Sequence, residues 1–179
     1  MKKCMVVLAV SLAAVAGCSS YRWTSSVPAE MRTVSVPTFR NETEVVELGA
    51  VATRQTLREF QREGTFKIAG PDDAALEVQA VLKSAPASLL NYKRGQSMRA
   101  YEHRLTLVAE VSLVDRRNGR VLIDNRVYRA DTTFFSDTDI VTTRRDASGR
   151  LAEDLARQIV DDVVSYGWDK AGAGRGGEE

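Results

Sequence analysis

The chain has 179 residues with 25 basic and 24 acidic side chains, one histidine and two cysteines. This balance of charge gives no electrostatic argument for binding nucleic acid. The cysteines, Cys4 and Cys18, both lie near the N-terminus and cannot build a disulfide framework. The length suits one domain with a proper hydrophobic core, whose stability must come from packing.

The first 17 residues have the anatomy of a secretory signal peptide. Lys2 and Lys3 form a short positive region, an apolar run covers residues 5–15, and the small Ala16 and Gly17 suit a peptidase groove. The apolar run is too short to cross a bilayer as a helix, which takes about 20 apolar residues. We therefore expect residues 1–17 to be removed, which leaves the mature chain nearly neutral.

The signal peptide leads into Val15-Ala16-Gly17-Cys18, which resembles the lipobox of bacterial lipoproteins. The resemblance implies that the Cys18 thiol carries a diacylglyceryl group and that its new amino group carries an acyl chain such as palmitate. Two or more acyl chains anchor a protein stably to a membrane. Ser19 stands where an aspartate would indicate retention in the inner membrane, so the resemblance implies the periplasmic side of the outer membrane. An ordinary signal peptide with an accidental cysteine is the alternative.

The remaining chain divides into a tether, one folded domain and a tail. Residues 18–32 are polar and predict a short lipidated tether, and residues 33–168 predict the domain. Residues 169–179 are rich in glycine and charge, which predicts disorder. The alternation of Thr33–Val36 predicts the first strand, and Pro37 closes it.

The first helix is predicted from Glu44 to Glu63. Asn41 and Thr43 can both cap its beginning, and Gly64 can cap its end. Apolar and small residues recur at spacings of three and four, which predicts one buried face. That face comprises Val45, Leu48, Ala52, Thr56 and Phe60.

The middle of the chain is dominated by alternating apolar and polar residues, which is typical of strands. A loop is predicted from Asn91 to Met98, and Pro86 indicates the end of a strand, a bulge or a sheet edge. The predicted strands are Thr65–Ala69, Leu76–Lys83, Arg99 to Leu113, and Arg120 to about Phe134.

The last two strands are predicted to form a hairpin, because Asn118-Gly119 is a strong turn signal. A two-residue turn there would pair Leu113 with Asp124 and Val111 with Arg126, which puts charges on the apolar face. We therefore expect a β-bulge near Ile123 to Asn125, or a longer loop with a shifted register.

A second helix is predicted from Asp139 to Tyr166. Its buried side comprises Leu151, Ala152, Leu155, Ile159, Val163 and Tyr166. The order of elements predicts an α+β fold, a two-layer sandwich with two helices packed on one face of a four- to five-stranded, mostly antiparallel sheet. Strands of about 15 residues span near 50 Å, whereas a helix of about 20 residues spans only 30 Å. We therefore expect the sheet to extend beyond its helices.

The sequence contains few groups that could perform catalysis. It has no glycine-rich phosphate loop, no cluster of residues at metal-ligand spacing, and no cysteine nucleophile once Cys18 is acylated. His103 could serve as a base, but its place beside Tyr101 in an apolar pattern favours a structural role. A hydrolase would need a nucleophile with a base beside it. We predict a non-enzymatic protein with no catalytic residues, no metal and no cofactor other than the acyl chains on Cys18.

One local concentration of positive charge surrounds the predicted loop between two strands. A solvated loop with cations that protect the sheet edge explains it. A site for anionic groups such as phosphates also explains it, with Leu89, Leu90 and Tyr92 offering apolar contacts to an amphiphile. The spacing does not separate these two interpretations. The cations are Lys83, Lys93, Arg94, Arg99 and Arg104.

From Cys18 to about Trp168, the chain resembles the LPS-assembly lipoprotein family, LptE. The resemblance rests on the order and spacing of several segments. They are VSVPTFRNETE, REFQREG, FKIAGPDDAALEVQAVL, RLTLVAEVSLVDRRNGRVL and LAEDLARQIVDDVV. The chain departs from the family at Ser19, where many members have glycine, and in the tail after Trp168.

This resemblance implies a sandwich lodged in the lumen of the outer-membrane β-barrel that transports lipopolysaccharide (LPS), an LptD-like protein. There the family helps the barrel to assemble, plugs it, and binds LPS on its way to the outer leaflet. The family's ligand contacts form no motif that can be carried over to these residues. The five cations are therefore an independent hypothesis for LPS binding.

A different class of outer-membrane lipoprotein, the activators of peptidoglycan synthases, also has α/β domains with a strand, an asparagine-containing turn and a helix. Such activators usually cross the periplasm on a long disordered linker. The tether from Cys18 to Thr33 has only about 15 residues and a reach of a few nanometres. The short tether favours the LPS-assembly interpretation, with the activator as the alternative.

Overall fold

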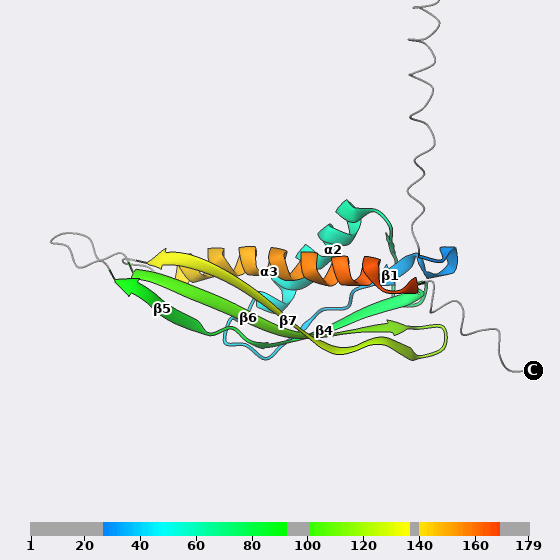
Figure 1. Ribbon diagram of the computed structural model, residues 1–179, viewed down its shortest axis with the longest axis horizontal. Coiled ribbons are helices and arrows are strands. Elements are labelled where there is room, and N and C mark those ends of the chain that lie inside the picture. Colours follow the sequence, from blue (N-terminus) through cyan, green and yellow to red (C-terminus); the bar gives the residue numbers. More distant parts are fainter. Residues whose placement is uncertain (1–26, 93–100, 137–139, 169–179) are drawn as a thin grey trace, which may run out of the picture.

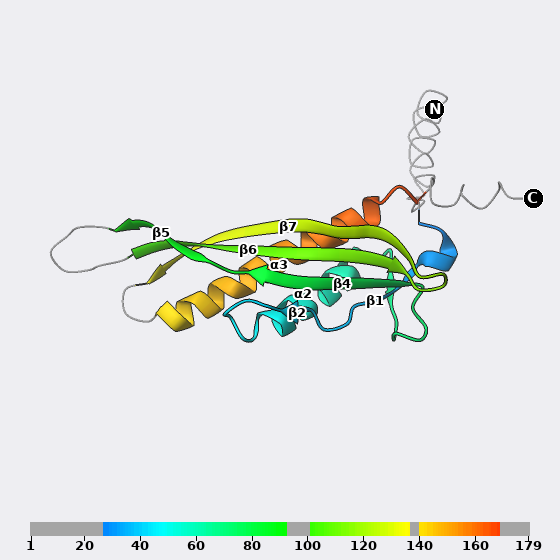
Figure 2. The same cartoon turned by 90° about the horizontal axis from the view of Figure 1, so that it is seen from below.

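The computed structural model describes residues 27–92, 101–136 and 140–168 (Figure 1). Two helices lie on one face of a seven-stranded sheet, and Figure 2 shows the sheet from its other face. The predicted α+β two-layer sandwich is therefore confirmed. The signal peptide, Cys18 and the tail after Trp168 lie outside the described residues.

The elements follow one another in nearly the predicted order. They are η2 Ala29–Met31, β1 Thr33–Ser35, β2 Arg40–Asn41, α2 Leu48–Glu63, β3 Lys67–Ile68, β4 Leu76–Ser84, β5 Ala87–Tyr92, β6 Tyr101–Asp115, β7 Arg120–Ser136 and α3 Ile140–Ser165. Val27 and Met31 lie in the segment expected to be tether, and both are buried in the core.

The seven strands occupy five rows, so the predicted four to five strands correspond to rows rather than to single strands. The row order is β3, then β1 with β2, then β4 with β5, then β6, then β7. Pro37 separates β1 from β2, and Pro86 separates β4 from β5, because proline cannot donate to a strand ladder. The sheet is mixed, since β1 pairs with β3 and β4 in parallel while β4 and β6 are antiparallel.

β5 is the longer of the two strands that the sequence pattern missed, and the other is β2, where a helix cap was expected at Asn41. Residues 87–92 pair antiparallel with β6, so the predicted loop is wrong at Asn91 and Tyr92, which end this strand. The rest of the predicted loop, from residue 93, lies outside the described residues. Ala85 and Pro86 separate β4 from β5, and the chain then resumes pairing along β6.

α2 begins at Leu48, four residues after the predicted start, because Asn41 organises a turn instead of capping the helix. Its Oδ1 accepts hydrogen bonds from the Thr43 backbone N at 3.1 Å and from Thr43 Oγ1 at 2.8 Å. Its Nδ2 donates to the Val45 carbonyl oxygen at 2.8 Å. The predicted end is confirmed, since Gly64 has φ 83° and caps the last turn.

The predicted irregularity of the hairpin is confirmed, and the loop is also longer than two residues. Asp115 pairs with Arg120, so four residues form the turn. Farther along, Leu113 pairs with Ile123 instead of Asp124, and the register shifts on both sides of this pair. Ile123 is therefore buried, and the bulge keeps an apolar residue on the core side of β7.

The other charged residue of this face, Arg126, does lie opposite Val111 as the simple register predicts. Its Nη1 forms an ion pair of 2.6 Å with Oδ2 of Asp162 on α3, and the Tyr128 hydroxyl donates to the same oxygen at 2.6 Å. A carboxylate on the covering helix therefore satisfies the polar groups that β7 presents to it. Desolvation on burial raises the pKa of Asp162, but the hydrogen bonds from Tyr128 and Arg126 outweigh it and lower the pKa.

A carboxyl whose pKa is lowered by folding stabilises the protein above the unfolded pKa, about 3.9, and loses this contribution as the pH falls through the folded pKa. We expect Asp162→Asn to lower the free energy of unfolding by about 1 kcal/mol at pH 7, since the side chain is 33% exposed. Urea denaturation at pH 7 and pH 3 measures this, with a smaller difference from wild type expected at pH 3. Asp161→Asn, at an exposed neighbour, is the control.

α3 also covers the outer edge of β7. Nε2 of Gln158 donates to the carbonyl oxygen of Arg129 at 3.0 Å, and Nη2 of Arg150 donates to that of Thr133 at 3.1 Å. These bonds satisfy edge carbonyls that no further strand pairs among the described residues. The predicted buried side of α3 is confirmed at Leu151, Ala152, Leu155, Ile159 and Val163. Tyr166, which was predicted to belong to it, follows the end of α3 and is half-buried against the core.

The sheet extends past the beginning of α3, as Figures 1 and 2 show for the ends of β5, β6 and β7. Large apolar side chains are exposed there: Leu89 by 54%, Leu90 by 41% and Phe135 by 61%. Exposed apolar groups gathered at one end of a molecule indicate a contact surface.

Candidate functional site

Two of the five cations proposed from the sequence, Lys83 and Arg104, lie within the described residues. Nζ of Lys83 lies 2.7 Å from Oε2 of Glu42 and 3.9 Å from Oε2 of Glu110. The hydrogen bond to Glu42 raises the pKa of Lys83 and contributes to lowering the pKa of Glu42. The charge of Lys83 is thus compensated within the fold, which makes it a weaker site for an external anion.

Arg104 lies in β6 between Ser88 of β5 and Thr133 of β7. It is exposed, and its neighbour Leu105 points into the core, so Arg104 lies on the sheet face that carries no helix. Lys83 and Arg104 share no acidic partner among the described residues. The three other cations, Lys93, Arg94 and Arg99, lie outside them.

His103, the one candidate base, stacks on Phe134 with ring centroids 5.1 Å apart and an interplanar angle of 14°. Phe134 is buried and His103 is half-buried. This packing fits the structural role that the sequence favoured.

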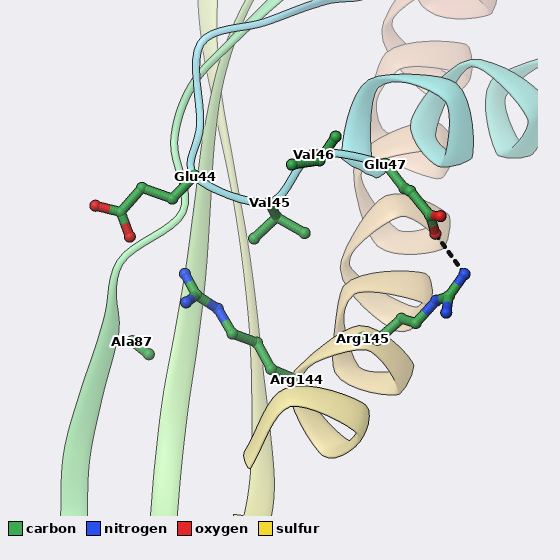
Figure 3. Close-up of a pocket in the computed structure, with 7 residues that line it drawn as sticks. All are labelled: Glu44, Val45, Val46, Glu47, Ala87, Arg144 and Arg145. Carbon is green, nitrogen blue, oxygen red and sulfur yellow. Dashed lines mark hydrogen bonds and ion pairs between the residues drawn. The ribbon is translucent and has the colours of Figure 1, made fainter. Parts of the chain in front are cut away.

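A pocket that the sequence did not predict lies between the loop before α2, the beginning of β5 and the first half of α3 (Figure 3). Its volume is about 420 Å³. Val45, Val46 and Ala87 provide apolar walls. The polar residues around it are Glu44, Glu47, Arg144 and Arg145.

The two arginines of this pocket have different partners. Nη2 of Arg145 lies 2.6 Å from Oε2 of Glu47, and both side chains are largely exposed. Nη2 of Arg144 donates to the carbonyl oxygen of Ala85 at 3.1 Å, whereas its buried Nε has no acceptor among the described residues. Buried donors are normally satisfied. The Nε of Arg144 is therefore an unsatisfied buried donor among the described residues, and it is not exposed to the pocket.

Sequence patterns could not reveal this pocket, because its residues come from three segments that only the fold brings together. The adjacent Arg144 and Arg145 are the single local signal, and a pair of arginines in a helix usually marks a solvated face.

Two further properties concern catalysis and membranes. Within residues 27–92, 101–136 and 140–168, no group of three His, Cys, Asp or Glu side chains is arranged to hold a metal ion. In the part of the chain that the structure describes, no helix has the length and apolar character needed to cross a bilayer.

The family model of LptE, described as lipopolysaccharide-assembly, matches residues 31–163. The chain belongs to the LptE family. This match includes every strand and both long helices except the last two residues of α3. LptE is a family of non-enzymatic lipoproteins, and membership supports a role in LPS assembly.

Solved structures show the same fold at low sequence identity. A homologue of the neuraminyllactose-binding hemagglutinin from Helicobacter pylori is 10% identical with a TM-score of 0.55, and the match covers 84% of this chain and 94% of that one. A DUF330 protein from Xanthomonas campestris is 12% identical with a TM-score of 0.53, over 81% of this chain and 92% of that one. A search of curated proteins finds no match.

Proposed function

We propose that this LptE-family protein is a lipid-anchored lipoprotein of the outer membrane that plugs and helps to assemble an LptD-like β-barrel. In this role it binds LPS for insertion into the outer leaflet, without catalysis and without a cofactor. The observation that carries the proposal is the LptE match across the sandwich, from residue 31 to residue 163.

The anchor is proposed at Cys18, with diacylglyceryl and N-acyl chains. The nine residues that lead from Cys18 to the buried Val27 reach at most about 30 Å. Such a reach keeps the sandwich beside the membrane, either on its periplasmic side or within the lumen of a barrel.

The barrel contact is supported by the shape of the sandwich. The ends of β5, β6 and β7 extend beyond α3 and expose Leu89, Leu90 and Phe135. Exposed apolar side chains do not stabilise a domain that stands alone in water, whereas a domain lodged in a partner can bury them.

The LPS contact is proposed at the cations around the β5–β6 connection. Arg104 is exposed, and Lys93, Arg94 and Arg99 lie close to it in sequence. Guanidinium groups and ammonium groups both bind phosphates. Lys83 is the weakest member of this set, because Glu42 already compensates its charge.

One purification tests this proposal. We expect the full chain, tagged at its C-terminus and extracted from outer membranes in mild detergent, to bring down a large β-barrel in stoichiometric amount together with LPS. Arg94→Gln/Arg99→Gln should keep the barrel and lower the bound LPS by about tenfold, the ratio for roughly 1.4 kcal/mol.

The matched control is Arg54→Gln/Arg58→Gln, which removes the same charge from exposed positions on α2 and should leave both partners bound. Unchanged LPS in the Arg94→Gln/Arg99→Gln variant would eliminate the cationic site. A penicillin-binding protein in place of the barrel would favour a peptidoglycan-synthase activator.

A further inference from the structure

We infer that the outer edge of β5, the side turned away from β6, accepts an extended segment of the barrel partner as an added strand that pairs with the backbone of Ala87 and Leu89. This inference rests on the proposed function and assigns the kind of contact that joins the two proteins. It involves no contact with LPS and none of the five cations around the β5–β6 connection.

The row formed by β4 and β5 loses its outer neighbours partway along. On the outer side of β4, β1 pairs with Leu76 and Glu77, and β2 pairs with Val81 and Leu82. β5 continues the row beside β6, but no described strand pairs with its outer side. Figure 3 shows the reason, since the chain that follows β2 turns away from the row at Glu44 and leads into α2.

The backbone groups on this open edge belong to Ala87 and Leu89. The backbone N of Thr106 in β6 donates to the Pro86 carbonyl at 3.1 Å, so Pro86 and Ser88 direct their polar groups toward β6. Successive residues of a strand direct these groups to opposite sides. The N–H and C=O groups of Ala87 and Leu89 therefore point outward.

Other outward-facing carbonyls of the sheet are satisfied by side chains of α3. Nη2 of Arg144 donates to the carbonyl of Ala85, the last outward-facing residue before β5. On the edge of β7, Gln158 and Arg150 donate to backbone carbonyls in the same way. In the part of the chain that the structure describes, no side chain does this for β5. Its outer edge is thus left for a partner.

β5 also lacks the features with which natural proteins block pairing at a sheet edge. Its sequence, ASLLNY, contains no charged residue and no proline. Leu89 is 54% exposed and Leu90 is 41% exposed. An open, uncharged edge with exposed apolar side chains pairs readily with another chain. This stretch therefore favours the addition of a strand.

The chemistry of the edge selects a polypeptide as its occupant. Ala87 and Leu89 each present one N–H and one C=O, and the two sets lie about 6.8 Å apart along the strand. An extended peptide repeats the complementary groups at the same spacing, and strand addition is a recurring mode of peptide recognition. The alkyl chains and phosphates of LPS offer no such repeat of donors and acceptors.

The position of the proposed anchor favours the barrel partner over a second copy of this chain. β5 lies at the opposite end of the sandwich from β1 (Figure 1). A twofold axis pairs identical strands antiparallel, so two copies joined through β5 would point in opposite directions. Residues 76–92 span about 55 Å, which would separate the two Val27 residues by on the order of 100 Å. A tether from Cys18 to Val27 reaches only about 30 Å. Both anchors could not enter one membrane, whereas the proposed barrel already lies in it.

Hydrogen exchange resolved to single residues tests the added strand. The full chain is compared alone and in complex with the co-purified barrel, in the same detergent. We expect the amides of Ala87 and Leu89 to exchange at least about 100-fold more slowly in the complex, because they gain hydrogen bonds there. The amide of Ser88, which faces β6, should exchange slowly in both samples.

A proline variant separates strand pairing from simple burial under the partner. Leu89→Pro removes the outward N–H, which proline tolerates at a sheet edge. In its complex, we expect Ala87 to exchange at the rate of the free chain. Leu89→Ala is the matched control, since it removes the same side chain but keeps the N–H, and Ala87 should stay slow. Slow exchange in the β4–β6 ladder shows that each variant is folded.

Two results would decide the role of the outward N–H. If Ala87 stayed slow in the Leu89→Pro complex, burial alone would explain its protection and the added strand would be overturned. If Leu89→Pro failed to retain the barrel while Leu89→Ala retained it, the inference would be supported.

A photoreactive label identifies the occupant and separates this inference from the proposed function. Benzoylphenylalanine at Ser88 of the full chain should form an adduct with the barrel in living cells. Adducts with only a second copy or only LPS would overturn the added strand. A barrel that co-purifies while Ala87 and Leu89 exchange as in the free chain would also overturn it, and would leave the proposed function standing. Absence of any barrel from the purification would overturn both.

Discussion

Replacing Trp168 with alanine is expected to lower the free energy of unfolding by about 3–5 kcal/mol. Trp168 follows α3 and is only 1% exposed. Its ring lies 5.0 Å from that of Tyr166 and 6.2 Å from that of Phe66, measured between centroids, and its Nε1 donates to the Val163 carbonyl at 3.0 Å. The substitution removes a large buried side chain and leaves that carbonyl without its indole donor.

Equilibrium denaturation in urea measures this loss. Trp168→Phe is the control, because it keeps an aromatic ring and removes the Nε1 donor, so we expect a smaller loss of about 1–2 kcal/mol. If Trp168→Ala lowered the free energy of unfolding by less than about 1 kcal/mol, the residue would not be packed in the core in solution. The domain would then end at α3.

Replacing Gly49 with alanine is expected to lower the free energy of unfolding by about 1–3 kcal/mol, although alanine is the better helix former by about 1 kcal/mol. A Cβ atom at Gly49 would lie 2.7 Å from the Phe39 carbonyl oxygen and 3.2 Å from Asn41 Cβ. One contact comes from the residue before β2 and the other from β2 itself, so α2 packs closely against this segment. Neither neighbour is the far end of a flexible side chain, so the helix would have to shift.

Gly149 of α3 provides a matched control, because a Cβ atom there would meet nothing within 4 Å. We expect Gly149→Ala to raise the free energy of unfolding by about 0.5–1 kcal/mol. Thermal denaturation of the two variants should therefore shift the midpoint in opposite directions. A higher midpoint in both would show that α2 can move away from β2 at little cost.

The candidate site could be predicted only in part. The cluster of cations was visible because its members lie close together in sequence. The sequence did not reveal that an acidic side chain compensates the charge of Lys83. Glu42 reaches Lys83 through the parallel pairing of β2 with β4, in which Asn41 lies opposite Leu82. Charge counted along the chain overlooks a partner from a distant segment.

The sequence by itself determined the features that depend on neighbouring residues. Period-two alternation identified β4 and β6, apolar spacings of three and four identified the buried faces of α2 and α3, and Gly64 ended α2. Each rests on local geometry, since a strand alternates its side chains and a helix repeats every 3.6 residues. The expectation of a bulge in β7 also came from sequence, because a regular register would have put charges on the core side.

The tertiary structure alone decided what depends on long-range contacts. Pairing along β6 made residues 87–92 a strand after Pro86. Asp162 satisfied Arg126 from a different layer, and three distant segments formed the pocket around Arg144. In each case the free energy comes from a partner far away in sequence, and no local pattern encodes which partner that will be.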